Sequence, residues 1–363
     1  MIKNLFFILS IFFLLSCGKS NEYAPPQIHP VVPNQPLSVI IILGDGMGIP
    51  QITATWHEHQ HLNLQEFPYT GLLLTHTTDK MVTESGAGAT AMFLGVKTKY
   101  GYQGMDSNGN YLESLYTYLK SRDYKTGIIT SSFITDASIA ALYSHGTDRY
   151  DYEKIALDFY HAFPDITIGG GQDHFDHRSD QINLIDSLSR QGVKLFYDVD
   201  GIAGVNTLPS IGFMHPFRPP YLLDGRSDFL QLGSQKALEL MGNEPFFLFI
   251  ESGLIDNAGH DMSIDDQVRE TQELDALAGM MKTYAQSKEN VLVLVVADHE
   301  SGALTLLQGD GMQYIPNYAV DEHSGNMVAT FAYGPGAENF TGLMDNTDIY
   351  YRLLNLIDKN LIP

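Results

Sequence analysis

Three apolar runs of this sequence each end at a carboxylate. They span residues 38–45, 246–251 and 291–298, and their last residues are Asp45, Glu251 and Asp298. Such runs, rich in β-branched and aromatic residues without polar alternation, are typical of parallel strands that are covered on both faces. Ligands of these sheets bind beyond the carboxyl ends of the strands. We therefore predict an α/β fold in which the three acids meet at one edge of a largely parallel central sheet, with helices on both faces.

The rest of the chain alternates between strand and helix patterns, as expected for a doubly wound fold. Further strands are predicted at 125–130, 165–168 and 327–333, and helices near 112–121, 152–163, 228–241, 265–287 and 347–356.

The first residues have the pattern of an export signal. Lys3 precedes an apolar stretch at 5–15 that is too short to span a bilayer as a finished helix. The stretch leads into Leu-Leu-Ser-Cys-Gly, which resembles a bacterial lipobox. We therefore predict a lipoprotein signal peptide at 1–16 and acylation of Cys17, which would lipid-anchor the exported protein to a bacterial membrane, in the periplasm or at the cell surface. The alternative is a free thiol behind an ordinary signal peptide.

Proline is frequent between residues 17 and 36, a composition that predicts an extended tether. Residues 37–363 contain no further linker-like stretch, and we expect them to form a single domain. Hydrophobic residues make up 44% of the chain, enough to bury a sizeable core, and a single cysteine leaves no pair for a disulfide.

The formal net charge of −22 makes nucleic acid an unsuitable partner. An anionic substrate would need a site that is locally positive against this background. Such a site would depend on bound cations and a well-placed arginine rather than on a general basic patch.

Ser85 begins a stretch of small residues, Ser-Gly-Ala-Gly-Ala-Thr-Ala. Small residues at a helix start let an anion approach the free N–H groups, so Ser85 is a candidate nucleophile beside a bound phosphate. The same stretch alone would also suit a helix packed on the sheet with a capping serine. The surrounding motifs decide between these interpretations.

Seven motifs occur in the order found in bacterial alkaline phosphatases. They lie at residues 44–48 (GDGMG), 83–87 (TESGA), 135–138 (TDAS), 145–149 (HGTDR), 251–260 (ESGLIDNAGH), 297–300 (ADHE) and 322–325 (EHSG). Over residues 39–356 the chain thus resembles that family, and the resemblance implies the alkaline phosphatase-like α/β fold.

The resemblance also implies a site with two Zn²⁺ and one Mg²⁺. The first zinc would be held by Asp256, His260 and His323. The second would be held by Asp45, Asp298, His299 and the Ser85 oxygen. Asp45 would also bridge to the magnesium, and Glu251 and Ser138 would complete the magnesium ligands, with Asp136 acting through a water. Ser85 would be the nucleophile, and Arg149 would bind the phosphate.

The implied activity is hydrolysis of small phosphate monoesters through a phosphoserine. Two cations about 4 Å apart can stabilise both the attacking and the leaving oxygen of an in-line phosphoryl transfer. A guanidinium binds two non-bridging oxygens at once. The oligomeric state stays open, with a homodimer as one option.

Other functions compete with this hypothesis. A phosphodiesterase or mutase of the same superfamily generally lacks the third metal, which Glu251 and Ser138 argue against. A non-catalytic surface lipoprotein that binds metal or phosphate would not need the nucleophile. Arg149 alone could be a partner of the neighbouring acids Asp148 or Asp151.

The sequence departs from the family pattern at three positions beside the site, and one of them is Ser138, where many members have threonine. Glu84 stands where many members have aspartate before the nucleophile, and because its side chain is one methylene longer, the resemblance does not by itself imply that it supports Arg149. Asn257 stands where some have lysine or histidine. A histidine-rich segment includes His57 and His61, which would share one face of a solvated helix rather than form a metal site.

Overall fold

The structure is a computed structural model that describes residues 35–361. The predicted signal peptide at 1–16, Cys17 and the predicted tether up to residue 34 lie outside the described residues. Within residues 35–361, no helix combines the length and the apolar character needed to cross a membrane.

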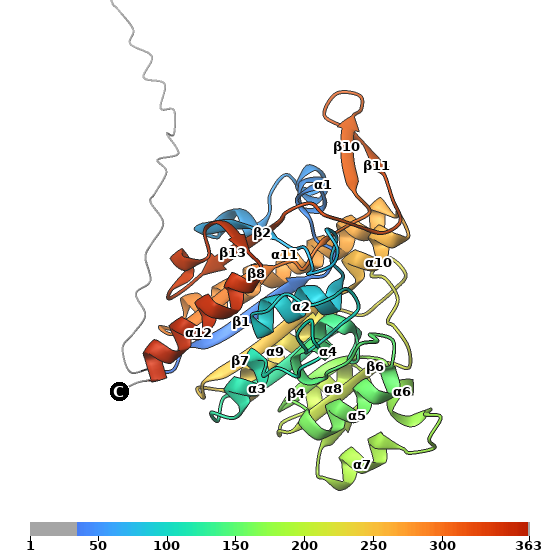
Figure 1. The fold of residues 1–363 in the computed structure, drawn as a ribbon, viewed down its shortest axis with the longest axis vertical. Helices are drawn as coiled ribbons and strands as arrows, with labels where there is room; N and C mark the ends of the chain where they lie inside the picture. The colour runs from blue at the N-terminus through green and yellow to red at the C-terminus, as the bar shows by residue number, and fades with distance from the viewer. Residues whose placement is uncertain (1–34, 362–363) are drawn as a thin grey trace, which may run out of the picture.

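A ten-stranded sheet forms the centre of the molecule, with the order β14-β2-β13-β8-β1-β7-β3-β4-β6-β5 (Figure 1). Its strands are β1 (Ser38–Gly44), β2 (Tyr69–Leu74), β3 (Lys125–Phe133), β4 (Ile166–Gly170), β5 (Lys194–Phe196), β6 (Ser210–His215), β7 (Phe246–Ser252), β8 (Val291–Val296), β13 (Val328–Tyr333) and β14 (Gly342–Asp345). All pairings are parallel except those of β13 with β2 and β8. The predicted α/β fold with a largely parallel sheet is confirmed.

The three runs that end in acids are the central strands of this sheet. β1 pairs in parallel with β7 on one side and with β8 on the other, so that Ile41 lies opposite both Phe249 and Leu294. Every residue of the three strands is buried. Buried β-branched and aromatic side chains remove apolar surface from water on both faces, which explains why these sequences show no polar alternation.

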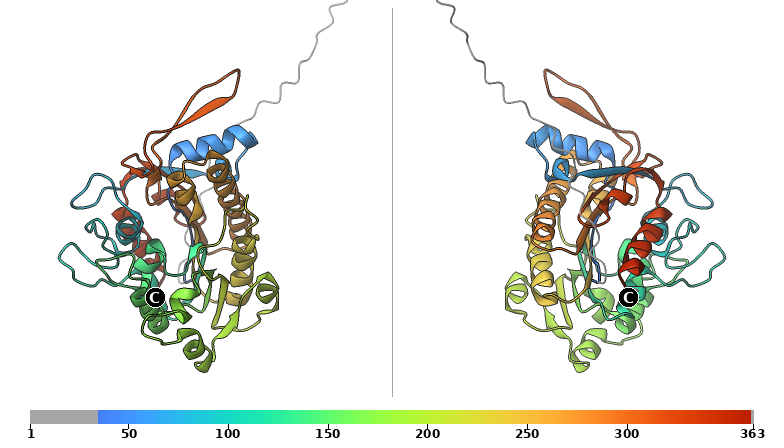
Figure 2. Two further views of the ribbon diagram at one scale, coloured as in Figure 1. Left: turned by 90° about the vertical axis from the view of Figure 1, so that its right-hand side faces the viewer. Right: turned by 90° about the vertical axis from the view of Figure 1, so that its left-hand side faces the viewer.

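Helices cover both faces of the sheet (Figure 2). They are α1 (Ile49–His59), α2 (Ser85–Leu94), α3 (Leu115–Lys120), α4 (Ala137–Tyr143), α5 (Tyr152–Ala162), α6 (Asp173–Asp176), α7 (Leu184–Arg190), α8 (Val199–Gly204), α9 (Phe229–Met241), α10 (Leu254–His260), α11 (Ile264–Gln286) and α12 (Thr347–Leu361), with 3₁₀ turns at Asn63–Glu66 and Ala337–Asn339. On one face α2 packs against α4 and α12, and on the other α9 and α11 lie on β7.

A hairpin of β10 (Leu304–Gln308) and β11 (Tyr314–Tyr318) projects from the body of the molecule (Figure 1). It follows the short strand β9 (Glu300–Ser301), which pairs with β12 (His323–Ser324). The β9–β12 pairing brings residue 323 back to the carboxyl edge of the central sheet, next to residue 299.

Two local expectations are corrected by the structure. The helix predicted from residue 112 begins at Leu115, because the Ser114 side chain caps it. The helix of the histidine-rich segment ends at His59, and Gln60 adopts a left-handed conformation with φ 59°. His61 therefore lies beyond the helix and does not share a face with His57.

Candidate active site

The carboxylates at the ends of β1, β7 and β8 meet at one edge of the sheet, as predicted. Asp45 directly follows β1, Glu251 lies within β7, and Asp298 follows β8 by two residues. Asp45 is 4% exposed, and the other two are fully buried. Burial of carboxylates without compensating positive charge raises the free energy of the folded state, so we expect bound cations at this edge of the sheet.

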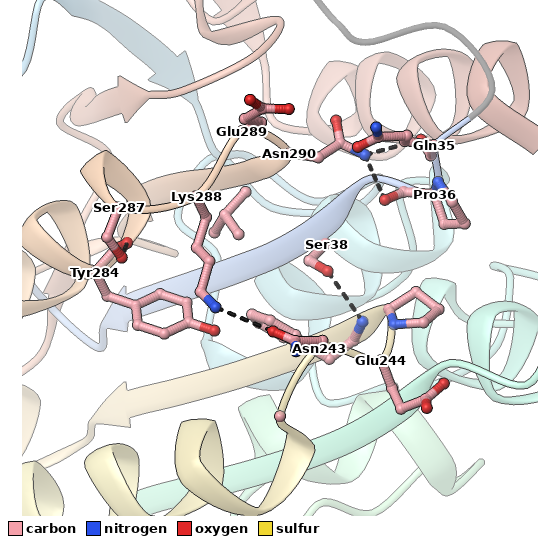
Figure 3. Close-up of a pocket in the computed structure, with 14 residues that line it drawn as sticks. Gln35, Pro36, Ser38, Asn243, Glu244, Tyr284, Ser287, Lys288, Glu289 and Asn290 are labelled. Carbon is pink, nitrogen blue, oxygen red and sulfur yellow. Dashed lines mark hydrogen bonds between the residues drawn. The ribbon is translucent and has the colours of Figure 1, made fainter.

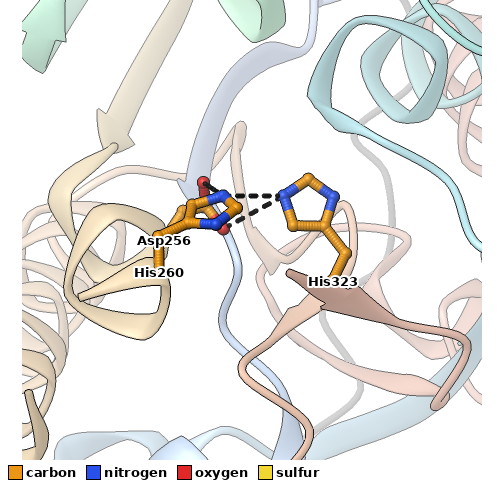
Figure 4. Close-up of side chains that lie close together, drawn as sticks. All are labelled: Asp256, His260 and His323. Atoms are coloured by element: carbon orange, nitrogen blue, oxygen red, sulfur yellow. Dashed lines mark hydrogen bonds and ion pairs between the residues drawn. The ribbon is translucent and has the colours of Figure 1, made fainter. Parts of the chain in front are cut away.

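Asp256, His260 and His323 form one cluster of ligand atoms (Figure 4). Asp256 and His260 lie one turn apart on α10, with 3.2 Å between His260 Nε2 and Asp256 Oδ2. The Nε2 atom of His323 lies 3.4 Å from Asp256 Oδ1 and 3.2 Å from His260 Nε2. The Nδ1 atoms of both rings face backbone carbonyls, those of Asp321 and Thr83. An Nδ1–H that donates to a carbonyl leaves Nε2 free for a metal.

A second cluster surrounds the Nε2 atom of His299. This nitrogen lies 3.3 Å from Asp45 Oδ1, 3.3 Å from Asp298 Oδ2 and 3.4 Å from Ser85 Oγ. The other oxygen of Asp298 accepts hydrogen bonds from the backbone N–H groups of Gly46 and His299, so only Oδ2 is directed into the cluster. The arrangement brings together one oxygen or nitrogen atom from each residue predicted for the second zinc.

The two clusters are adjacent. The rings of His299 and His323 stack with 3.6 Å between their centroids. Asp256, His299 and Asp45 also have ligand atoms within 4.8 Å of one another, which places Asp256 between the clusters.

The second oxygen of Asp45 faces a third group of residues. Ser138, in the first turn of α4, donates to Asp45 Oδ2 over 3.1 Å. Glu251 accepts from Thr130 through Oε2, whereas its Oε1 is buried without a hydrogen-bond partner. Asp136 caps α4 and lies at the border of this group. The two oxygens of Asp45 thus serve different groups, which is the geometry of a bridging carboxylate.

Ser85 is the first residue of α2, and Glu84 caps that helix. The Glu84 carboxylate accepts from the backbone N–H groups of Gly86 and Ala87 over 2.8 and 2.7 Å. It also binds Arg149, whose Nη1 lies 2.6 Å from Glu84 Oε2. Arg149 Nη2 in turn lies 3.4 Å from Ser85 Oγ. The longer Glu84 side chain therefore supports Arg149, and the pairing of Arg149 with Asp148 or Asp151 does not occur.

The electrostatics of these residues fit divalent cations. Burial, reinforced by Asp298 and other neighbouring carboxylates, raises the pKa of Asp45 well above its usual range. Burial likewise raises the pKa of Glu251 to about 8 and that of Asp298 to about 7. Burial lowers the pKa of His299, which keeps its ring neutral and able to bind a metal. Asp256, Asp298 and Glu251 each have a buried oxygen that accepts no hydrogen bond, and these oxygens provide ligand positions of the kind that Zn²⁺ and Mg²⁺ take.

A cavity of about 280 Å³ opens onto these residues. The buried residues Asp45 and Ser85 line it together with Arg149, and its more exposed part is lined by residues that the predicted site did not include: Tyr100, Phe133, Tyr150, Tyr152, Arg218 and Glu322. No recognisable motif marks Tyr150 and Tyr152, or Arg218 between Phe217 and two prolines. Only the fold brings them to this edge.

A larger cavity of about 370 Å³ lies at the opposite edge of the sheet (Figure 3). It is formed where β1, β7 and β8 begin, and Asn290 there donates to the backbone carbonyls of Gln35 and Pro36. Lys288 donates to Asn243 across it. This cavity contains no cluster of metal ligands among the described residues, and we do not assign it to the reaction.

Comparison with known proteins agrees with this geometry. The family model for alkaline phosphatase matches residues 37–317. The chain belongs to the alkaline phosphatase family. Its members hydrolyse phosphate monoesters with the help of metal ions, so this protein is a metal-dependent phosphomonoesterase.

Relatives and solved structures cover most of the chain. Alkaline phosphatase of Escherichia coli K12 is 27% identical over 87% of this chain and 85% of the relative. The repressible alkaline phosphatase of Saccharomyces cerevisiae is 30% identical over 74% of this chain and 55% of the relative. The structure of alkaline phosphatase from the Antarctic bacterium TAB5 has a TM-score of 0.85 and 28% identity over 90% of this chain and 99% of that one. A variant of the TAB5 enzyme was solved with Mg bound in its M3 site.

Proposed function

We propose that this phosphomonoesterase acts through a phosphoserine intermediate on Ser85, with two zinc ions and one magnesium ion at the site. The observation that carries the proposal is the position of Ser85 Oγ. It lies 3.4 Å from His299 Nε2, 3.4 Å from Arg149 Nη2 and 3.5 Å from Asp45 Oδ1. The oxygen thus lies between a phosphate-binding guanidinium and the second group of metal ligands.

The proposed first step is attack of Ser85 Oγ on phosphorus. The new bond joins Oγ to phosphorus, the bond to the alcohol oxygen breaks, and the alcohol leaves with a proton. The guanidinium of Arg149, fixed by Glu84, binds non-bridging oxygens. The dipole at the start of α2 favours the same negative charge. Water then attacks the phosphoserine, which releases inorganic phosphate and restores Ser85.

Each ion would have its own ligands. We assign the first zinc to Asp256, His260 and His323, the second to Asp45, Asp298, His299 and Ser85, and the magnesium to Asp45, Glu251 and Ser138, with Asp136 acting through water. When bound, the cations would supply positive charge at the attacking and leaving oxygens and lower the pKa of the serine hydroxyl. The orphaned oxygen of Glu251 supports the third position.

Replacement of Ser85 by alanine tests the intermediate. We expect Ser85→Ala to lower kcat by roughly a thousandfold or more, because the covalent route is lost. Elemental analysis should find two zinc ions and one magnesium ion in the wild type and at least the first zinc and the magnesium in the variant. Ser234→Ala, which changes another buried serine on α9, is the matched control. Activity that survives both Ser85→Ala and chelation would contradict the mechanism.

We also propose that the enzyme is exported and lipid-anchored through Cys17, with residues 37–363 as one catalytic domain. The signal-like residues 1–16 and the lipobox support this. Metabolic labelling with a fatty acid should mark the wild type and leave Cys17→Ser unmarked.

A homodimer is proposed as the oligomeric state. Exposed apolar side chains on α1, β2 and β10 support it, among them Ile49 and Leu72, which line a groove of about 450 Å³. Sedimentation of the purified domain would measure the mass of the particle.

A further inference from the structure

Arg218 lies at the mouth of the catalytic cavity, and none of the proposed steps uses it. The cavity is also lined by Arg149 at its inner end, so that two guanidinium groups face the same space of about 280 Å³. Arg218 is exposed and follows β6, whose carboxyl end lies at the same edge of the sheet as Asp45.

The backbone around Arg218 is fixed by the residues that follow β4. Gly171 N–H donates to Phe217 O over 3.0 Å. A Cβ on Gly170 would meet Phe217 O at 2.5 Å and Pro219 Cδ at 2.6 Å, so only glycine allows this close approach. Gly170 and Gly171 thus give the segment around Arg218 a defined place beside the cavity.

The guanidinium of Arg218 has no acidic partner among residues 35–361. Arg149 pairs with Glu84, and Arg226 pairs with Glu270. No carboxylate forms an ion pair with Arg218 within this described range, although the chain carries a formal net charge of −22. An arginine that stays unpaired in so acidic a protein is available to an external anion.

Arg218 also acts electrostatically on the aromatic side of the mouth. Its charge opposes the effect of burial, which raises the pKa of Tyr152 to about 12. The Tyr152 ring stacks on His174 with 4.4 Å between centroids, and Phe133 lies 5.6 Å away from it. Arg218 and the aromatic rings of Tyr152 and Phe133 line the same cavity, in which a group attached to the phosphate would lie while Arg149 holds the phosphate itself.

We propose that Arg218 binds a second anionic group on the leaving part of the substrate, so that the enzyme prefers phosphate monoesters that also carry a carboxylate or a further phosphate. The inference rests on the proposed function of the site. It adds a binding residue for the substrate class and leaves the attack at Ser85 unchanged.

Matched substrate pairs test the proposal. sn-Glycerol 3-phosphate and 3-phosphoglycerate differ by a carboxylate, whereas fructose 6-phosphate and fructose 1,6-bisphosphate differ by a second phosphate. For each pair, kcat/KM of the substrate with the second anionic group is divided by kcat/KM of the substrate without it. This ratio is measured in the metal-loaded wild type, in Arg218→Ala and in Arg218→Lys. We expect Arg218→Ala to lower one or both ratios about tenfold, because a charge-assisted contact is lost, and Arg218→Lys to restore part of the preference. The pair that responds identifies the second group.

Arg190→Ala is the matched control, because it removes an exposed arginine on α7 that does not line the cavity. Its ratios should equal those of the wild type. If Arg218→Ala leaves the ratio unchanged in both pairs, the proposal is overturned. This holds also where kcat/KM falls equally for both members of each pair, because Arg218 then attracts phosphate in general. If the wild type hydrolyses none of the four substrates, the result would instead contradict the proposed function.

Discussion

At the scale of single residues, Glu84 both caps α2 and contacts Arg149. Its Oε1 atom caps α2 through Ala87 N–H and also accepts from Gly101 N–H over 3.1 Å. Its Oε2 atom accepts from Gly86 N–H and from Arg149. The longer side chain, which departs from the family pattern, thus makes both sets of contacts. It lets one buried carboxylate cap the helix of the proposed nucleophile and orient the arginine that is proposed to bind phosphate.

Replacement of Glu84 by glutamine should lower kcat/KM about tenfold. The amide nitrogen cannot accept a hydrogen bond, so either the cap or the contact with Arg149 is lost, and a hydrogen bond to a charged group contributes about 1.5–3 kcal/mol. We also expect weaker inhibition by inorganic phosphate, because Arg149 is no longer held. Glu84→Asp, the residue of many relatives, is the control and should stay within a few-fold of the wild type. An unchanged phosphate inhibition constant in Glu84→Gln would argue against this role.

At the scale of elements, α11 is tied to the segment before α9 by a buried network with unequal charges. Arg226 contacts both Glu270 and Glu273, and all three side chains are at most 3% exposed. One guanidinium thus faces two carboxylates. Burial raises the pKa of Glu270 to about 7 and also raises that of Glu273.

This network should make the fold less stable as the pH rises. A carboxyl group whose pKa is raised on folding favours the native state below its unfolded pKa, and this contribution is lost as the pH passes the folded value. For Glu270 the window runs from about 4.5 to about 7. A shift of this size corresponds to a few kcal/mol at most. Glu273→Gln removes the competing charge, so urea unfolding should show a smaller loss of stability between pH 5 and pH 8 than in the wild type.

The control for this experiment is Glu239→Gln on α9, where the glutamate is exposed and pairs with Lys236. It should reproduce the pH dependence of the wild type. A Glu273→Gln variant that loses as much stability as the wild type over the same interval would show that Arg226 compensates both acids.

The same scale shows how far the sequence could predict the molecule. The strands β1, β7 and β8 were predictable because buried parallel strands are continuous apolar runs. β2 and β6 were missed because Tyr69–Leu74 is exposed at alternate residues and Ser210–His215 contains a glycine and ends in histidine. The reversed direction of β13 has no local signal. Motifs located the candidate metal ligands, whereas the position of Arg218 depends on how β6 lies beside β4, which only the tertiary structure supplies.

At the scale of the whole molecule, the metal ions should contribute to stability as well as to catalysis. Without cations, the buried carboxylates at the sheet edge repel one another, and protons relieve part of this repulsion. The pKa of Asp298 is raised to about 7 and that of Glu251 to about 8, so both groups hold protons at pH 6 and lose them by pH 9. The stability that protonation provides is therefore lost as the pH rises through this window.

Metal removal should accordingly lower Tm more at pH 9 than at pH 6. We expect a difference between metal-loaded and metal-free protein of roughly 5 °C or more at pH 9, since ligands that bind only the native state stabilise it. Calorimetry of dialysed metal-free protein, with and without added zinc and magnesium, measures it. A difference that is equal or smaller at pH 9 would indicate that the carboxylates are already compensated by protein groups.

The described chain begins at the edge of the sheet that lies away from the catalytic cavity. Gln35 and Pro36 are held there by Asn290, and β1 then runs roughly 20 Å through the core before it reaches Asp45. A group attached directly at this end would therefore contact the side of the domain that lies away from the catalytic cavity. A support bound directly to residue 35 would lie on the side of the domain away from the cavity with Arg218 and Tyr152 and would leave that cavity open to the fluid.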